Sequence, residues 1–167
     1  YLEQHSEYLI CHTEEIWYRN GTRVNPMKKH KKSGGWIFQR CLPLCVISPS
    51  SVLLHTDLLN TVGLFDEQLP ACEDYDLWLR ICAQHPVAFI EQALTYKYGG
   101  HDDQLSRAYW GMDRFRIYAL DKILQQGTLS TDDHMAALNM LAEKIAIFIQ
   151  GAKKHGRNDE IAHYTKV

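Results

Sequence analysis

The segment ACEDYDLWLR, residues 71–80, places three carboxylates within four residues, immediately before an apolar-periodic stretch. Pro70 ends the segment before it, and the apolar residues that follow recur with the spacing of one buried helical face: Leu77, Trp78, Ile81 and Cys82. The acids therefore fall on the first turn of a predicted helix, where free N–H groups and the helix dipole favour negative charge by roughly 0.3–1 kcal/mol per group. An ionised carboxylate held there is a candidate general base.

The same acids also have a purely structural interpretation. Acidic residues open many helices as caps and dipole partners, without any catalytic role. The wider sequence favours the catalytic interpretation, because three further motifs surround the acidic one. They are ISPSSVLL at residues 47–54, VGLFDEQL at 62–69 and YGGH at 98–101.

The four motifs occur in the order and with the spacing of bacterial family 2 glycosyltransferases of the GT-A fold, and the chain resembles the C-terminal half of these enzymes over residues 1–107. The resemblance implies an α/β fold with a mixed sheet. Residues 1–105 would form the acceptor-side half of a GT-A domain, and residues 106–167 a C-terminal helical extension.

The resemblance also assigns roles to residues. It implies that Asp74 is the catalytic base, that Glu73 beside it orients the acceptor, and that Gly63 belongs to an acceptor-side loop. His101 matches a late histidine that binds a divalent ion, Mg²⁺ or Mn²⁺, in family relatives. Two alternatives stay open: Gly63 also suits the end of a short helix, and a lone histidine such as His101 is often a surface residue.

Other residues of the motifs have two interpretations each. Trp78 could stack on a sugar ring, but it lies on the apolar face of the predicted helix, which favours core packing. Asp76 points away from Asp74 around the helix and is expected to be a structural cap. Arg80, together with Gln104 and Arg107, is a candidate either for contact with a diphosphate or for surface hydrogen bonds.

One part of the family pattern is missing. The N-terminal half of a GT-A enzyme supplies the nucleotide-binding unit and an Asp-x-Asp metal motif, and nothing before Tyr1 supplies them here. We therefore expect a fragment of a hexosyltransferase-like enzyme that moves a sugar from a nucleotide-diphosphate sugar to an acceptor hydroxyl with inversion, and that is inactive alone. The alternative is a non-catalytic helical interaction or binding module.

Composition limits the partners and the setting. The 167 residues suit about one domain, and 46% hydrophobic content is enough for a core. A net charge of −2 with mixed signs gives no field for nucleic acid, and no stretch approaches the roughly 18 apolar residues of a membrane span. Five cysteines without a pairing pattern indicate reduced thiols.

From these features we expect a cytoplasmic protein, with the inner face of the membrane as an alternative location through peripheral contact. The expected partners are a nucleotide-sugar donor and a saccharide or lipid-linked acceptor, and we expect the isolated chain to self-associate through open sheet edges.

Patterns along the chain predict the main elements. Asn20-Gly21 predicts a hairpin turn between strands at 14–19 and 22–24, with a separate strand at 8–12. Further strands are expected at 46–54, 87–90 and 94–98, and helices at 36–42, 56–62, 106–126 and 130–154. The basic run KKHKK at 28–32 is expected to be solvated, with phosphate contact as the alternative.

Overall fold

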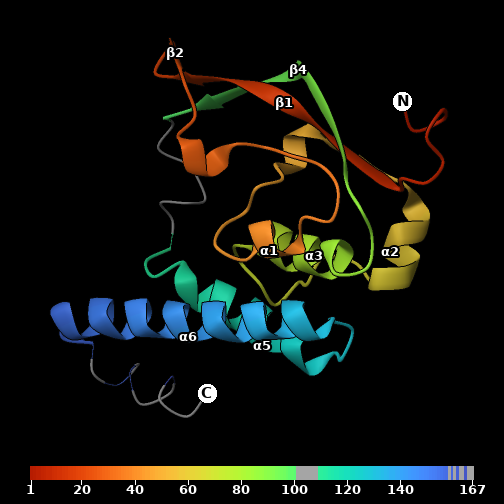
Figure 1. Ribbon diagram of the computed structural model, residues 1–167. Helices are drawn as coiled ribbons and strands as arrows, with labels where there is room; N and C mark the ends of the chain where they lie inside the picture. Colours follow the sequence, from red (N-terminus) through yellow and green to blue (C-terminus); the bar gives the residue numbers. More distant parts are fainter. Residues whose placement is uncertain (101–108, 158, 160, 162–163, 165–167) are drawn as a thin grey trace.

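The computed structural model describes residues 1–100, 109–157, 159, 161 and 164. A mixed sheet forms one side of the molecule, short helices lie beneath it, and a pair of long helices forms the opposite side (Figure 1). The chain is thus mixed α/β with a helical C-terminal part, as the sequence predicts.

The sheet is built around one central strand, β1 (Ile10–Arg19). Along one edge, β3 (Val52–Leu54) pairs antiparallel with its beginning and β2 (Thr22–Val24) pairs antiparallel with its end. Along the other edge, β4 (Ala88–Gly99) runs parallel to β1 over nearly its whole length. Antiparallel and parallel partners on one strand make the sheet mixed.

The hairpin between β1 and β2 confirms the predicted turn. Asn20 has φ of 49° and Gly21 has φ of 77°, the two positive values that a type I′ turn requires. Arg19 pairs with Thr22 directly across this turn.

Three predicted strand boundaries differ from the structure. Strands are expected at 8–12 and 14–19, but a single strand, β1, runs through residues 10–19, and the single strand β4 at 88–99 likewise replaces the expected strands at 87–90 and 94–98. Where the sequence predicts gaps between strands, the structure has continuous strands with irregular pairing. The register between β1 and β4 shifts on both sides of Glu14. Conversely, the expected strand 46–54 is mostly not a strand, since Pro49 begins a 3₁₀ turn, η2 (Pro49–Ser51).

The helices of the middle layer lie close to their predicted places. They are α1 (Phe38–Cys41), α2 (Thr56–Val62) and α3 (Glu73–Cys82), and a 3₁₀ turn, η1 (Lys28–His30), precedes them. Gly63 ends α2 with φ of 87°, as the sequence predicts. Every residue of α3 from 75 to 82 is buried, because other elements cover the helix on all sides.

The C-terminal helices are α5 (Asp113–Gln125) and α6 (Thr131–Lys154). Ser130 caps α6 as predicted, its hydroxyl accepting from the N–H of Asp133 at 3.2 Å. Against the sequence expectation, α6 contains a window long and apolar enough by length and composition to cross a membrane, although its buried residues pack inward: Ala137, Leu141, Phe148 and Ala152.

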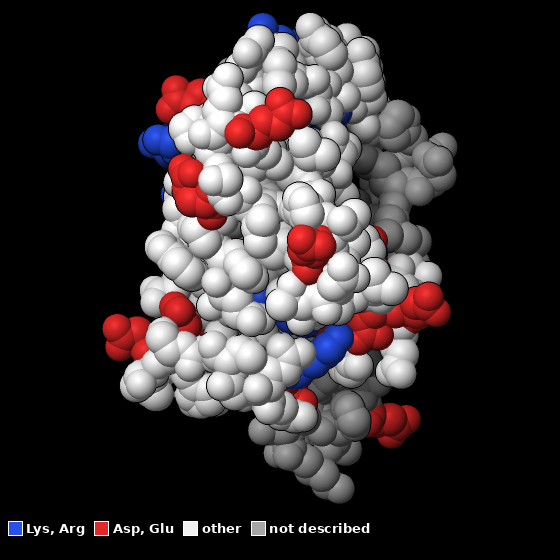
Figure 2. Space-filling view, turned by 90° about the vertical axis from the view of Figure 1, so that its right-hand side faces the viewer, with Lys and Arg blue, Asp and Glu red and all other residues white. Residues whose placement is uncertain are grey.

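One hydrophobic cluster joins the helical layers. Trp78 and Leu79 of α3 belong to the same buried cluster as Leu120 of α5 and Leu141 of α6. The segments on either side of the predicted boundary at residue 105 therefore share a core. The side of the molecule on the right of Figure 1 is largely uncharged, with acidic groups scattered over it (Figure 2).

Candidate active site around Asp74

The first turn of α3 begins with a strained residue. Cys72, the residue before the helix, has φ of 63° and ψ of 19°, the left-handed region that side chains other than glycine rarely adopt. Its carbonyl still accepts the first helical hydrogen bond, from the N–H of Asp76 at 3.1 Å. Backbone strain of this kind is common at functional sites, where the surrounding structure holds it in place.

Asp74 is held in one position by two hydrogen bonds. Its carboxylate is half-buried, and Oδ1 accepts from the backbone N–H of Tyr75 at 2.7 Å. Oδ2 accepts from the thiol of Cys45 at 3.1 Å. A carboxylate that is half-buried and held by donors keeps a defined position and can still reach a ligand at the surface.

The thiol of Cys45 keeps the proton that it can donate to Asp74. Burial and, next, the charge of Asp74 raise the pKa of the Cys45 thiol well above its usual range, so the sulfur keeps its proton at neutral pH. The same sulfur lies 3.1 Å from the carbonyl oxygen of Ile47. The start of the 47–54 motif therefore lies against the acidic motif, although more than twenty residues separate the two along the sequence.

Glu73, the predicted neighbour of the base, is also half-buried. Its Oε2 is fully covered and has no hydrogen-bond partner among the described residues. A buried carboxylate oxygen without a partner is costly and calls for an explanation, such as a ligand that donates to it.

Trp78 and Gly63 have structural contacts. The Trp78 side chain is packed in the core and is only 1% exposed. It would have to leave the core to stack on a sugar. Gly63 is exposed and its carbonyl accepts from Arg80 Nη1 at 3.1 Å. His101, the predicted metal ligand, lies outside the described residues, as do Gln104 and Arg107.

Arg80 corrects a sequence expectation, because it lies neither on the surface nor at a diphosphate site. Its side chain is 5% exposed, and its Nε and Nη2 donate to Asp76 Oδ2 at 3.0 and 2.8 Å. The guanidinium also donates to three successive carbonyls, those of residues 62, 63 and 64. Arg80 thereby fixes the loop after α2 to the far end of the helix that carries Asp74.

A lysine of the C-terminal part completes this network. Lys122 of α5 lies 2.6 Å from Asp66 Oδ2 and 3.1 Å from Asp76 Oδ1. Its ammonium lowers the pKa of the Asp66 carboxyl, chiefly through their hydrogen bond. No local pattern predicts this contact, because Lys122 follows α3 by forty residues and meets its partners only in the fold.

The basic run at 28–32 divides into exposed and buried residues. Lys28, Lys29 and Lys31 are exposed, in agreement with a solvated run. Lys32 is buried: its Nζ lies 3.4 Å from Glu15 Oε1 and donates to Ser51 Oγ at 2.7 Å. Both interpretations of Lys32 from the sequence are therefore wrong, since it is neither solvated nor open to a phosphate.

The described residues do not on their own fit a site for Mg²⁺ or Mn²⁺. In residues 1–100 and 109–157 no three histidine, cysteine, aspartate or glutamate side chains lie close enough together to hold a metal ion. Glu73 and Asp74 are neighbouring carboxylates, but Asp74 is already bonded to Cys45 and Tyr75.

Two proteins of known sequence resemble part of this chain. It is 37% identical over 68 residues to a protein of Rickettsia felis named uncharacterized glycosyltransferase, and 38% identical over 68 residues to one of Rickettsia conorii with the same description. Each match covers 40% of this chain, and the chain spans only 11% of the length of either relative. No protein-family profile and no solved structure matches. The two matches support a relationship to glycosyltransferases.

Proposed function

We propose that this chain is the acceptor-side part of an inverting glycosyltransferase and that Asp74 is its general base. The observation that carries the proposal is the half-buried Asp74 carboxylate, fixed by Cys45 and Tyr75 on the first turn of α3. The names of the two rickettsial relatives support a transferase of sugars. The finer assignment to family 2, to the GT-A fold and to hexosyl transfer rests on the motif resemblance.

The reaction needs one proton acceptor on the acceptor side. An acceptor hydroxyl attacks the anomeric carbon of a nucleotide-diphosphate sugar, its proton passes to the Asp74 carboxylate, and a new C–O bond forms. The bond from the anomeric carbon to the phosphate oxygen breaks on the opposite face, and the nucleoside diphosphate leaves with the electron pair. Attack opposite to the leaving group inverts the anomeric configuration.

The surroundings of Asp74 suit this task. The thiol of Cys45 stays protonated, so its single S–H is available to Asp74 Oδ2, which shares it with the Ile47 carbonyl oxygen at the same 3.1 Å. A base held in place gains from proximity, since the reacting atoms need no further ordering. We propose that Glu73 orients the acceptor, which requires a turn of its side chain, because its partnerless Oε2 is covered in the described part of the chain.

The proposal also includes a nucleotide-sugar donor and a divalent ion. Both follow from the motif resemblance and not from contacts among the described residues. We propose that His101 contributes to a Mg²⁺ or Mn²⁺ site that serves the nucleotide-sugar donor. Titration of Mn²⁺ with and without a nucleoside diphosphate, on protein with and without His101→Ala, tests this. Equal affinities in both proteins would remove His101 from the metal site.

The test of the base is Asp74→Asn in the longest natural protein that carries this sequence. Release of nucleoside diphosphate is measured with a panel of UDP-, GDP- and dTDP-sugars and saccharide acceptors. We expect turnover to fall at least about a hundredfold, as loss of a general base commonly does, while donor affinity changes little. The side chain of Asn keeps the size of Asp and loses the proton acceptor.

The matched control is Asp57→Asn, an exposed acid in the first turn of α2. It should leave turnover within about twofold, and both variants should melt near the unaltered protein. Equal, small effects of the two substitutions would eliminate Asp74 as the base. The non-catalytic interaction module would then be the better description of the chain.

A further inference from the structure

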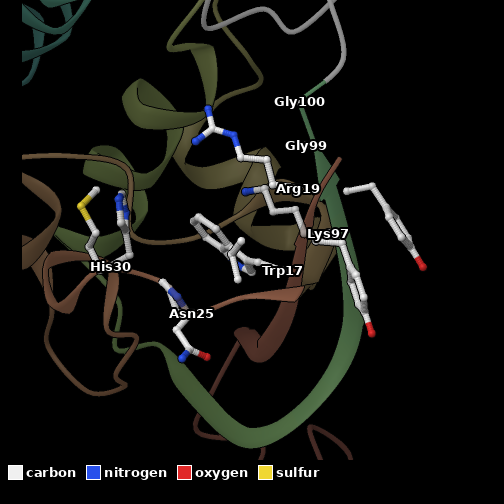
Figure 3. Close-up of a pocket in the computed structure, with 12 residues that line it drawn as sticks. Trp17, Arg19, Asn25, His30, Lys97, Gly99 and Gly100 are labelled. Carbon is white, nitrogen blue, oxygen red and sulfur yellow. The ribbon is translucent and has the colours of Figure 1, made fainter. Parts of the chain in front are cut away.

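A pocket away from Asp74 lies where β1, β2 and β4 come together beside η1, and it has a volume of about 400 Å³ (Figure 3). Trp17 and Arg19 reach it from β1, Lys97 from β4, and Asn25 and His30 from the segment after β2. The size suits a small ligand rather than a single ion. None of these side chains takes part in the contacts of Asp74.

The aromatic wall of the pocket is held rigidly. The indole Nε1 of Trp17 donates to Glu15 Oε2 at 2.9 Å, which fixes the plane of the ring. The Lys97 ammonium lies 5.1 Å from the centre of that ring, and the His30 ring lies 5.5 Å from it. Trp17 and Lys97 are register partners in β1 and β4, so the sheet itself sets their spacing.

The charged side chains among the described lining residues have one sign. They are Arg19 and Lys97, and none of the described lining residues is Asp or Glu. Glu15, whose Oε2 accepts from Trp17, is already paired with buried Lys32 at 3.4 Å. In a chain with net charge −2, two cations around one hollow are a local exception that attracts an anion.

Donors remain for a ligand within the part of the chain that the structure describes. Lys97 Nζ donates to Ser48 Oγ at 2.9 Å, which uses one of its three N–H groups. No hydrogen bond or ion pair of the Arg19 guanidinium is found among the described residues. The positive surroundings also show in His30, whose pKa is lowered by burial and then by the charges of Lys29 and Lys97.

We propose that this pocket binds a phosphate group attached to a sugar ring, with the phosphate between Lys97 and Arg19 and the ring against Trp17. Lysine and arginine are the donors that phosphate oxygens prefer, and an indole packs well against the apolar C–H groups of a sugar. A nucleotide-diphosphate sugar and a lipid-linked sugar diphosphate share this chemistry. The proposal does not depend on Asp74 acting as a base.

The experiment is titration calorimetry with three probes: glucose 1-phosphate, UDP-glucose, and vesicles that carry a polyprenyl-diphosphate sugar. We expect glucose 1-phosphate to bind and uncharged methyl glucoside to bind at least tenfold more weakly. Tighter binding of UDP-glucose than of glucose 1-phosphate would assign the pocket to the nucleotide sugar. Tighter binding of the vesicles would assign it to the lipid-linked sugar.

Variants link the binding to the pocket. Lys97→Met should weaken glucose 1-phosphate binding about tenfold or more, since a hydrogen bond between charged groups is lost, and Lys97→Arg should stay within about threefold. Lys29→Met is the matched control, because it removes the same charge from a neighbouring exposed residue that does not line the pocket. It should change the affinity less than twofold.

Two further variants separate the parts of the proposal. Trp17→Leu should weaken glucose 1-phosphate more than inorganic phosphate, because only the sugar ring meets the indole. Asp74→Asn should leave binding unchanged, which separates this pocket from the base. The proposal is overturned if glucose 1-phosphate fails to bind to the unaltered protein, or if Lys97→Met and Lys29→Met weaken it equally.

Discussion

The thiol of Cys45 and the carboxylate of Asp74 form a hydrogen bond of 3.1 Å, sulfur to Oδ2, between residues 29 positions apart. The bond joins the segment that enters η2 to the first turn of α3. The two groups also interact electrostatically. After burial, the charge of Asp74 is the second cause of the raised pKa of Cys45.

The first prediction uses this coupling. Cys45 should react with iodoacetamide at pH 8 at least about tenfold more slowly than an exposed cysteine, since only the thiolate reacts. Asp74→Asn removes the negative charge, lowers the pKa of Cys45 and should speed the reaction several-fold. Mass spectrometry of the Cys45 peptide gives the rate. Asp57→Asn serves as the control, and identical rates in all three proteins would contradict the coupling.

A second prediction concerns the buried pair of Asp76 and Arg80. Arg80→Met leaves the Asp76 carboxylate without its main partner and three carbonyls of the 62–64 loop without donors, so it should cost about 3–5 kcal/mol of unfolding free energy. Urea unfolding measures the loss. The double variant Arg80→Met, Asp76→Leu should recover part of it, because no unpaired charge then stays buried. A loss below about 1 kcal/mol in the single variant would show that the pair carries little stability.

The third prediction concerns the C-terminal helices. Lys122→Met removes the cation that α5 places between Asp66 and Asp76, and should destabilise the protein by about 1–3 kcal/mol. Lys154→Met, on the exposed end of α6, should cost less than about 0.5 kcal/mol. If both variants unfold at the same urea concentration as the unaltered protein, the link between α5 and the loop is not a source of stability.

A fourth prediction concerns pH. Burial lowers the pKa of His12 from 6.5 to about 4, and the neutral ring keeps its Nε2 at 2.9 Å from the Ser33 carbonyl. Between these pH values the unfolded chain binds a proton that the folded chain does not. Stability therefore falls as the pH drops from 6.5 to about 4, by about 3 kcal/mol from this group.

His12→Gln tests the assignment, because glutamine keeps an N–H donor and does not titrate. Urea unfolding at several pH values between 4 and 7 gives the free energy of unfolding as a function of pH. This free energy should fall less steeply with decreasing pH in the variant than in the unaltered protein. His30, whose pKa is also lowered, contributes in the same direction and stays in both proteins. If the free energy of unfolding depends on pH equally steeply in both proteins, His12 is not the group that lowers stability in acid.

The fifth prediction concerns self-association. Leu94 and Tyr96 of β4 are 58% and 60% exposed on one face of the strand, although both are large and apolar. A surface of this kind invites contact with a second copy. Sedimentation at rising concentration should show dimers or larger species that Leu94→Glu, Tyr96→Glu abolishes. A protein that sediments as a monomer throughout would refute this expectation.

Local patterns predicted the elements whose causes are local. Asn20-Gly21 specified its turn, Gly63 ended α2, and Ser130 began α6, because each effect arises within a few residues. The continuity of β1 and β4 was missed, since the irregular pairing between them depends on both strands at once.

The candidate site divides in the same way. The acids of α3 and their place on its first turn follow from sequence alone. The partner of Asp74 does not, because Cys45 had no pattern that distinguished it from four other cysteines. Arg80 and Lys32 were misassigned for a related reason. The sequence around a charged residue does not show that other elements will bury it against a carboxylate, which is Asp76 for Arg80 and Glu15 for Lys32.

The irregular pairing of β1 with β4 has a further consequence for the sheet. Thr13 pairs with Ile90, Glu14 with Ala93 and Glu15 with Thr95, so β4 advances five residues where β1 advances two. Side chains alternate between the faces of a strand, and deleting one residue from 91–94 would turn the rest of β4 over. Lys97 would then leave the side of Trp17, and a tyrosine would replace it. The number of residues in this bulge, rather than their chemical nature, determines which β4 side chains meet Trp17.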